Sequence, residues 1–328
     1  MTVTYRPPRH AELADCALVW YSAVDEYMAR LNRPLPPPYL DPLLTLLEHL
    51  LATDPERFLV AVRPPDPETG PGRDQVVGFG IAAQREHVWF LSQLYVLPHE
   101  QGHGIGRALL TQILPSLPDR AADGGTASST PGTSGLDDRR PGILAVCTDT
   151  AQPVSNGLYA RFGIVPRAPV FNLVGTPNPS ALARLPAGVE AVPFGGTGPS
   201  TEIDAIDRVV LGYAHPADHA HLRATGRTGF VYRTSGGEPL GYGYSSEAGR
   251  FGPVALLDEK LTAQVLGHLM TVIRPRGATS VWVPGANDRA VVALLRAGLR
   301  IEGFPALLCW TRPFAEFERY IPASLALL

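Results

Sequence analysis

The sequence predicts an α/β protein made of two related domains. Its 328 residues, 45% of them hydrophobic, are enough for two cores of ordinary size. Short apolar strands are interspersed with amphipathic helices along the chain. A late segment also repeats an early one: WVPGANDRAVVALLRAGL (282–299) aligns with VCTDTAQPVSNGLYARFGI (146–164), and GYGYSS (241–246) echoes GFGIAA (78–83). These observations together predict two copies of one fold.

Changes in amino-acid composition along the chain predict where the domains begin and end. The first domain covers residues 1–175, a Pro- and Ala-rich linker covers 176–190, and the second domain covers 191–328. Within the first domain, residues 116–142 contain almost no large apolar side chains. Such a segment cannot bury enough surface to fold, so we expect a flexible insertion.

The spacing of apolar residues, and the prolines and glycines that interrupt it, predict the helices and strands of the first domain. Apolar residues at steps of three and four, beginning Leu13, Ala17 and Trp20, predict a helix over 11–32. The following prolines end this helix. The other expected helices are 42–52, 104–114 and a short one within 155–164, and the expected strands are 58–62, 76–83, 87–96, 143–149 and 169–175.

Charge and cysteine usage exclude several classes of function. A net charge of −3, with no block of Lys or Arg, argues against nucleic acid or an anionic membrane as partner. No apolar run approaches the roughly 20 residues of a membrane span. Cys16, Cys147 and Cys309 have no metal or redox spacing, so we expect no metal and a cytoplasmic, reducing location. Mid-strand Cys147 is expected to be a small buried hydrophobe rather than a nucleophile.

Three glycines, Gly102, Gly104 and Gly106, follow the strand at 87–96 and open the next helix. A helix N-terminus exposes about four unpaired N–H groups and about half a positive charge, which suits a phosphate. A nucleoside-triphosphate loop would need Lys-Ser/Thr after its last glycine, but Arg107-Ala108 stands here. The acidic residue of a dinucleotide fold, about 20 positions further on, would fall in the insertion.

The stretch resembles the acyl-CoA loop of the GCN5-related N-acetyltransferases (the GNAT family). Leu94-Tyr95-Val96 is followed by Gln101-x-x-Gly104-x-Gly106, and Leu158-Tyr159-x-x-x-Gly163-Ile164 resembles a later motif of the family. The resemblance covers about residues 1–175. Together with the internal repeat, it implies that each domain is GNAT-like, with a mixed, largely antiparallel central sheet flanked by helices.

The resemblance also implies residue roles. Backbone groups of Leu94, Tyr95 and Val96 would pair with the pantetheine arm of acetyl-CoA, the expected co-substrate. Tyr159 would be the general acid that protonates the leaving thiolate. We expect His103 to face solvent or the nucleotide. The pyrophosphate would be held by the loop residues Gln101, Gly102, His103, Gly104, Ile105, Gly106 and Arg107.

The general base is less clearly indicated. Relatives carry a carboxylate near position 93, where this chain has Gln93. Glu86, with its neighbour His87, is the nearest candidate, and a chain of water molecules is the alternative. Asp25 and Glu26 could instead bind the substrate ammonium. Gln152 replaces the family's usual Asn, which puts one contact to the CoA arm in doubt.

The second domain lacks the features that would hold a cofactor. Residues 250–270, RFGPVALLDEKLTAQVLGHLM, correspond to the loop and helix of the first domain but contain no glycine loop. Leu294 aligns with Tyr159 in the sequence repeat, and leucine cannot donate a proton. We expect an altered GNAT-like domain that has lost its cofactor.

The function expected from these features is acetyl-CoA-dependent transfer of an acyl group to the amine of a small molecule, by direct attack in the first domain. Trp20, Tyr21, Trp89 and Phe90 could line the acceptor pocket, although core packing explains them equally well. The alternative is a non-catalytic acyl-CoA sensor or scaffold, which the missing carboxylate at Gln93 favours. The oligomeric state stays open.

Overall fold

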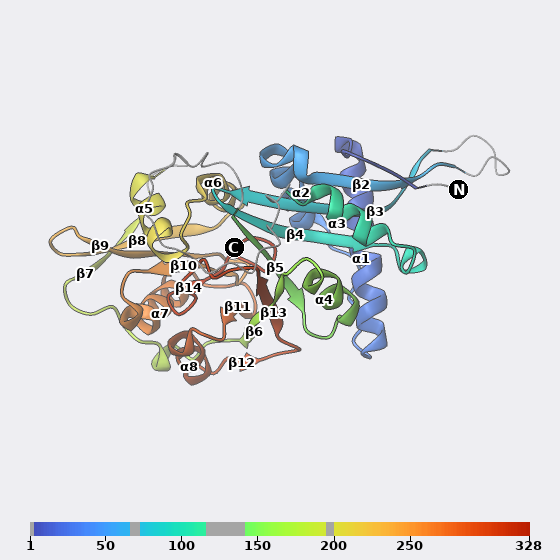
Figure 1. The fold of residues 1–328 in the computed structure, drawn as a ribbon. Coiled ribbons are helices and arrows are strands. Elements are labelled where there is room, and N and C mark those ends of the chain that lie inside the picture. The colour runs from blue at the N-terminus through green and yellow to red at the C-terminus, as the bar shows by residue number, and fades with distance from the viewer. Residues whose placement is uncertain (1–2, 66–72, 116–141, 195–199) are drawn as a thin grey trace, which may run out of the picture. The chain divides into compact units, whose positions relative to one another are not determined.

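The structure is a computed structural model that describes residues 3–65, 73–115, 142–194 and 200–328 (Figure 1). The predicted insertion at 116–142 therefore lies outside the described residues, apart from Gly142. The chain divides into two compact units: residues 1–89 with 93–142, and residues 90–92 with 143–328. No described helix is long and apolar enough to cross a membrane.

Unit 1 is built around an antiparallel sheet. β1 pairs with β2, and β2 with β3, in antiparallel register, and β4 is next in the strand order. Every helix and strand predicted in this part of the chain is present, within a few residues of its expected bounds. The elements are β1 (Thr4–Arg6), α1 (Leu13–Arg30), α2 (Asp41–Thr53), β2 (Phe58–Arg63), β3 (Gln75–Arg85), β4 (Val88–Val96) and α3 (Ile105–Ile113).

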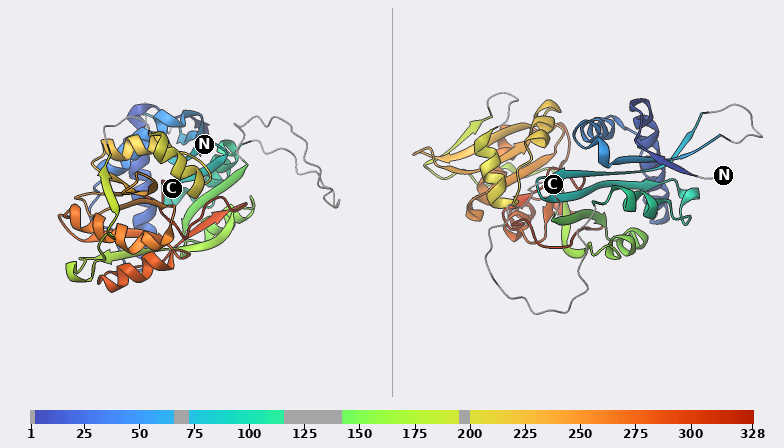
Figure 2. Two further views of the ribbon diagram at one scale, coloured as in Figure 1. Left: turned by 90° about the vertical axis from the view of Figure 1, so that its left-hand side faces the viewer. Right: turned by 45° about the horizontal axis from the view of Figure 1, so that its top comes forward.

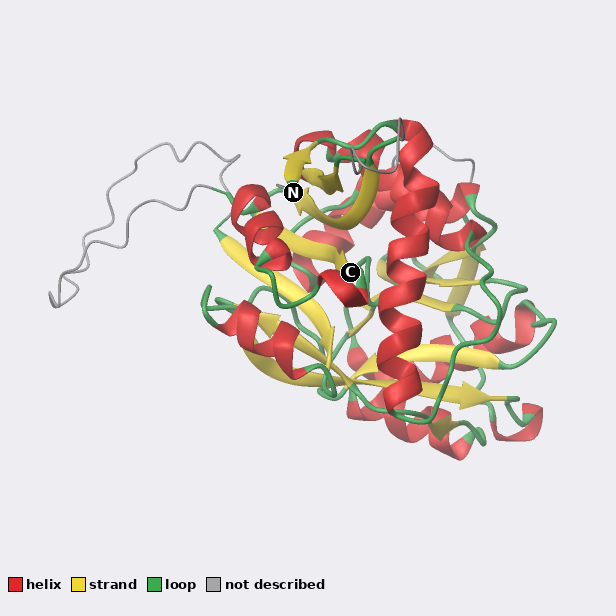
Figure 3. Ribbon diagram, turned by 90° about the vertical axis from the view of Figure 1, so that its right-hand side faces the viewer, coloured by secondary structure: helices red, strands yellow, loops and turns green. Residues whose placement is uncertain are grey.

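Alternate residues of β3 and β4 face different helices. An added Cβ on Gly80 would lie 3.2 Å from Ile113 of α3, so the absence of a side chain lets α3 approach the sheet closely. Tyr95 points to the other side, where its ring lies 6.4 Å from that of Trp20 on α1. α1 is the long helix in Figure 3, with 18 residues. The sheet is thus positioned between α1 and α3, with the end of β4 feeding into α3.

Unit 2 contains two groups of strands. In the first, antiparallel pairing joins the strands in the order β5-β13-β6-β11, and β12 also pairs with β6. The second is an antiparallel sheet in the order β14-β10-β9-β8-β7. The strands are β5 (Ile143–Asp149), β6 (Val165–Gly175), β7 (Val189–Pro193), β8 (Thr228–Thr234), β9 (Pro239–Ser245), β10 (Phe251–Leu256), β11 (Thr279–Pro284), β12 (Arg300–Ile301), β13 (Ala306–Trp310) and β14 (Tyr320–Ile321).

Five helices accompany these strands: α4 (Pro153–Ala160), α5 (Thr201–Val210), α6 (Pro216–Ala224), α7 (Thr262–Val272) and α8 (Asp288–Arg296). α7 and α8 lie side by side (Figure 2). Their inner faces share a core with β10 and β11, in which Leu269 and Leu294 are at most 1% exposed. The second unit thus has its own hydrophobic core.

Local geometry repeats where the sequence predicted a repeat. Gly163 after α4 and Gly298 after α8 both have left-handed φ, of 78° and 93°, and end their helices. In β9, an added Cβ on Gly243 would come within 2.8 Å of Leu269 on α7, much as Gly80 of β3 is crowded by α3. Both glycine-containing strands thus lie under the helix that follows the next strand.

The compact units do not divide where the predicted domains do. β5 and β6, from the predicted first domain, belong to the same unit as β11 and β13 from the predicted second. That residues 1–175 and 191–328 are two copies of one fold stays a prediction. The predicted linker contains a short 3-10 helix, Pro179–Ala181, and Ala183 packs so closely on Gly267 of α7 that no side chain would fit there.

Candidate acyl-CoA loop and its surroundings

The glycine loop joins β4 to α3 within unit 1. A 3-10 turn, Pro98–Glu100, leads into it. Gly102 and Gly104 both have φ of 82°, a left-handed conformation that favours glycine, and Gly104 is the N-cap of α3. An added Cβ at either position would meet nothing within 4 Å. The backbone therefore turns sharply while its outer surface stays uncovered.

The amide groups of this loop are available to a ligand. The first α3 amide that bonds back into the turn is that of Ala108, which donates to the carbonyl of Gly104 at 3.0 Å. Among the described residues, no backbone carbonyl accepts from the amides of Gly102 to Arg107. Ile105 is buried and offers only its amide, whereas residues 101–104 and Arg107 are exposed. Such a concave run of amides at a helix N-terminus suits a phosphate or diphosphate.

Side chains below the loop hold it in place. The side-chain amide of Gln101 donates from Nε2 to the backbone carbonyl of Val96 at 3.0 Å, and the ring Nδ1 of His103 lies 3.2 Å from the backbone carbonyl of Glu100. The buried Glu100 carboxylate forms an ion pair with Arg63 of β2. The shape of the loop is therefore fixed by contacts to β2 and β4, and this preorganisation reduces the entropy that a ligand would have to remove.

Tyr159, the expected general acid, lies near the C-terminal end of α4 in unit 2. Its side chain is 5% exposed, and its carbonyl accepts from the amides of Phe162 and Ile164. These bonds and the left-handed Gly163 fix the end of the helix. The motif Leu158-Tyr159-x-x-x-Gly163 thus has a local structural basis in addition to the expected chemical one. The role of Tyr159 stays a prediction.

Glu86 occupies the hairpin turn between β3 and β4, with φ of 48° and an exposed side chain. It lies at the opposite end of β4 from the glycine loop. At about 3.3 Å per residue, its backbone is roughly 23 Å along the strand from that of Gln93. The structure therefore does not bring Glu86 to the loop, and its role as general base stays a prediction.

Gln93 replaces the family's carboxylate and lies in the interior of unit 1. Its side chain is 7% exposed, and its Oε1 atom has no hydrogen-bond partner among the described residues. A neutral amide cannot act as a base at pH 7, but its oxygen can accept a hydrogen bond.

Other candidates have structural contacts. Asp25 accepts from the amide of Leu35 at 3.0 Å and so closes the turn after α1, and Glu26 pairs with Arg30 one turn along the same helix. Trp89 is fully buried and donates to the carbonyl of Ile113, which identifies it as a core residue. Burial raises the pKa of the Cys147 thiol, which agrees with the expected hydrophobic role.

The corresponding place before α7 has a different chemistry. Asp258 caps the short 3-10 helix Glu259–Leu261, and its carboxylate accepts from the amide of Lys260 at 3.0 Å. The backbone amide of Lys260, which a phosphate would need as a donor, is thus already hydrogen-bonded to a carboxylate. Glu259 adds a second negative charge. Leu294, which aligns with Tyr159 in the sequence repeat, lies on α8, is 1% exposed and belongs to the hydrophobic core of unit 2.

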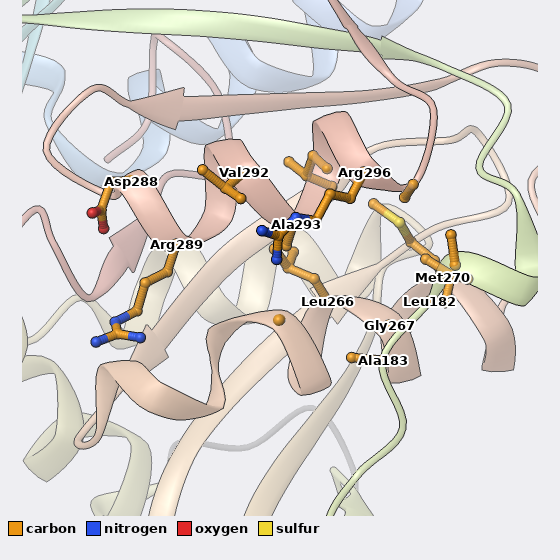
Figure 4. A pocket seen from close by; sticks show the side chains of 14 residues that line it. Leu182, Ala183, Leu266, Gly267, Met270, Asp288, Arg289, Val292, Ala293 and Arg296 are labelled. Atoms are coloured by element: carbon orange, nitrogen blue, oxygen red, sulfur yellow. The ribbon is translucent and has the colours of Figure 1, made fainter.

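A cavity of about 370 Å³ lies between α7, α8 and the segment around Leu182 (Figure 4). Its lining is mainly aliphatic, with Asp288, Arg289 and Arg296 as its charged residues. It contains no histidine, tyrosine or cysteine among the described residues that line it. The cavity therefore offers no group suited to protonate a thiolate.

Sequence reasoning missed one polar cluster, formed by Asp207, His215 and His219 in unit 2. All three side chains are at most 3% exposed, although residues of these types are usually found at the surface. The four-residue spacing of the two histidines was the available signal. The cluster is considered further below.

Comparison with solved structures defines the class of fold. A proposed acetyltransferase from Pyrococcus horikoshii superposes with a TM-score of 0.69 at 15% identity, covering 99% of this chain and 96% of its own. A GCN5-related N-acetyltransferase from Sphaerobacter thermophilus gives a TM-score of 0.56 at 15% identity, with 97% and 98% covered. A tandem GNAT protein from the clavulanic acid biosynthesis pathway gives 0.52 at 14%, with 95% and 99% covered. The chain thus has the fold of GNAT proteins, including a tandem one.

Residues 24–127 match the model of the acetyltransferase (GNAT) family. This segment contains α3 and the glycine loop, so the match agrees with the family resemblance of the motifs. No curated protein matches the sequence.

Proposed function

We propose that this protein is an acetyl-CoA-dependent N-acyltransferase that acylates the amine of a small molecule. The observation that carries the proposal is the run of unbonded amides from Gly102 to Arg107 at the start of α3. The match of residues 24–127 to the GNAT family model, together with the GNAT fold, supports acyl transfer in general. In this proposal the loop binds the pyrophosphate, and the backbone of Leu94 to Val96 pairs with the pantetheine arm.

The proposed reaction is direct attack on the thioester. The neutral amine adds to the carbonyl carbon, the C–S bond breaks, and the thiolate leaves with a proton from Tyr159. A phenol has a reference pKa of about 10 and is protonated at neutral pH, as a proton donor must be. A correctly placed general acid contributes about 10²–10⁴-fold to the rate.

The proton acceptor has two candidates. Glu86 could act only through a chain of water molecules, given its place at the far end of β4. Water alone is the other. Glu86→Gln separates them: a lower kcat with a shifted pH–rate profile supports Glu86, and an unchanged profile assigns deprotonation to water.

The second GNAT-like copy is proposed to have lost its cofactor. Asp258 already bonds the amide of Lys260, Glu259 would repel a diphosphate, and Leu294 cannot donate a proton. This copy then serves to support the fold. The three cysteines of the whole chain, Cys16, Cys147 and Cys309, are unpaired, in keeping with the proposed reducing, cytoplasmic location.

Ligand-dependent unfolding tests the proposed cofactor. Acetyl-CoA at 100 times its Kd should stabilise the native protein by about 2.7 kcal/mol. A panel of small amines should then produce free thiol from acetyl-CoA. Stabilisation without thiol release from any amine would support the alternative, an acyl-CoA sensor or scaffold, which the uncharged Gln93 favours.

A further inference from the structure

Three elements of unit 2 bring together a buried cluster that the proposed acyl transfer does not use. Asp207 comes from α5, His215 and His219 come from the start of α6, and two tyrosines of β9, Tyr242 and Tyr244, lie against them. The carboxylate and both imidazoles are almost completely inaccessible to water. Burying such groups is costly unless they are paired or bind a metal.

Three potential ligand atoms converge on one point. The Oδ2 atom of Asp207 lies 2.9 Å from Nε2 of His219 and 3.3 Å from Nε2 of His215. All three lie within 4.8 Å of one another. Ligand atoms around a tetrahedral zinc ion, at metal distances of about 2.0–2.1 Å, are separated by about 3.3 Å. The two separations from Oδ2 of Asp207 are close to that value. The shorter one is a hydrogen bond to His219, whose proton a metal ion would replace.

The opposite sides of Asp207 and His219 are hydrogen-bonded, and that of His215 faces a carboxylate. Tyr242 donates from its hydroxyl to Oδ1 of Asp207 at 2.5 Å, and Nδ1 of His219 lies 3.0 Å from the hydroxyl of Tyr244. The Nδ1 atom of His215 faces Oδ2 of Asp218 at 3.6 Å. Metal-binding histidines are usually oriented in this way, because an oxygen partner on the second nitrogen directs the first toward the metal.

A second, independent observation concerns His215. Its side chain is 1% exposed, yet neither ring nitrogen makes a hydrogen bond among the described residues, although carboxylate oxygens of Asp207 and Asp218 lie 3.3 and 3.6 Å away. A buried polar atom without a partner is unusual and destabilising. A cation placed between Nε2 of His215 and Oδ2 of Asp207 would give the His215 nitrogen a partner, and Oδ2, which is hydrogen-bonded to His219, would become a ligand.

We propose that Asp207, His215 and His219 bind a divalent metal ion of the zinc type. The charge of the ion balances the carboxylates of Asp207 and Asp218. Oxygen and imidazole ligands suit zinc, and histidines four residues apart can share one ion. The depth of the site excludes a substrate, so the role is structural: the ion links α5 and α6, and through Tyr242 and Tyr244 it supports β9.

The competing state holds a proton in place of the metal. Burial opposes a charged His215, but the carboxylates of Asp207 and Asp218 outweigh this effect and raise its pKa to about 10. A protonated His215 would then form ion pairs with both carboxylates. Metal content distinguishes the two states directly.

The test uses the full chain, purified without a histidine tag, treated with a chelator and then titrated with Zn²⁺ or Co²⁺. We expect about one equivalent of bound zinc, a higher unfolding temperature, and visible Co²⁺ absorption bands typical of nitrogen and oxygen ligands without thiolate. Because these measurements use the unmodified protein, they do not depend on any variant folding. Absence of binding and of stabilisation would overturn the proposal in favour of the proton.

Variants locate the metal. Asp207→Asn and His219→Gln should each lose the bound zinc, and Tyr244→Phe should weaken binding about 10–100-fold. His268→Gln is the matched control, because this histidine belongs to the same unit but bonds Tyr232 outside the cluster. Zinc retained at full stoichiometry in Asp207→Asn and His219→Gln would place the metal elsewhere and overturn the assignment.

Discussion

Tyr159 is the residue on which the proposed chemistry depends. Replacing it with phenylalanine keeps the ring in its buried site and removes only the hydroxyl. We expect Tyr159→Phe to lower kcat about 10²–10⁴-fold while affinity for acetyl-CoA is retained, because the thiolate would leave unprotonated. Steady-state kinetics with an accepted amine measures this effect. Unchanged turnover would remove Tyr159 from the mechanism.

Glu12 provides a residue-scale prediction about pH. Its carboxylate accepts from Arg6 at 2.7 and 2.8 Å and from the amide of Arg9 at 2.7 Å. These bonds, led by the one from Arg6, outweigh burial and lower the pKa of Glu12 to about 2. A lowered folded-state pKa contributes stability above the unfolded value of about 4.3, and that stability is lost as the pH falls toward 2.

We therefore expect Glu12→Gln to destabilise the protein at pH 7 by about 2 kcal/mol, allowing for the partial exposure of Arg6. The difference from the unmodified protein should disappear between about pH 4.5 and 2. Urea unfolding over a series of pH values measures it. Glu26→Gln is the control, since its ion pair with Arg30 lies on the surface of α1. An equal effect of both changes would contradict the account.

At the scale of elements, the connection from β4 to α3 is the decisive one. Gly104→Ala forces a side chain into left-handed φ, which costs about 1–2 kcal/mol, and distorts the amides that face the ligand. We expect CoA affinity to fall about tenfold or more. Gly237→Ala is a matched control, because Gly237 has φ of 89° and open space around its Cβ but lies in the β8–β9 turn. Isothermal titration with CoA compares the two, and equal losses would contradict a specific role of the loop.

Most elements of the first half could be predicted because their signals are local. The spacing of Leu13, Ala17 and Trp20 gives α1, and the prolines and glycines mark where elements end. The loop itself was predicted because three glycines stand between a predicted strand and a predicted helix, in a motif that resembles the acyl-CoA loop; the left-handed φ of Gly102 and Gly104 came only from the structure. Local patterns carry this much information when one face of an element is buried.

What the sequence could not predict depends on distant partners. β13 lies between β5 and β6, and no local pattern indicates that residues 306–310 separate these two strands. The buried cluster was missed because Asp207 and His219 are residue types of the surface, and only the packing of α5 and α6 on β9 makes them interior. The distance of Glu86 from the loop, by contrast, follows from the predicted strand 87–96 that separates them, and was predictable from the sequence.

At the scale of the whole molecule, we propose two GNAT-like copies with different capacities to bind a cofactor. The first copy has a glycine loop with open amides, and the second has Asp258 and Glu259 at the corresponding place. A diphosphate should therefore bind the chain in only one of the two. Gly104→Ala should then weaken all measurable CoA binding rather than leave a second site intact.

The most direct test of the central claim is calorimetric titration of the full chain with CoA. The account predicts about one equivalent bound per chain, with affinity reduced by Gly104→Ala and retained by Gly237→Ala. No measurable binding of CoA or acetyl-CoA, or binding that Gly104→Ala leaves unaltered, would contradict it.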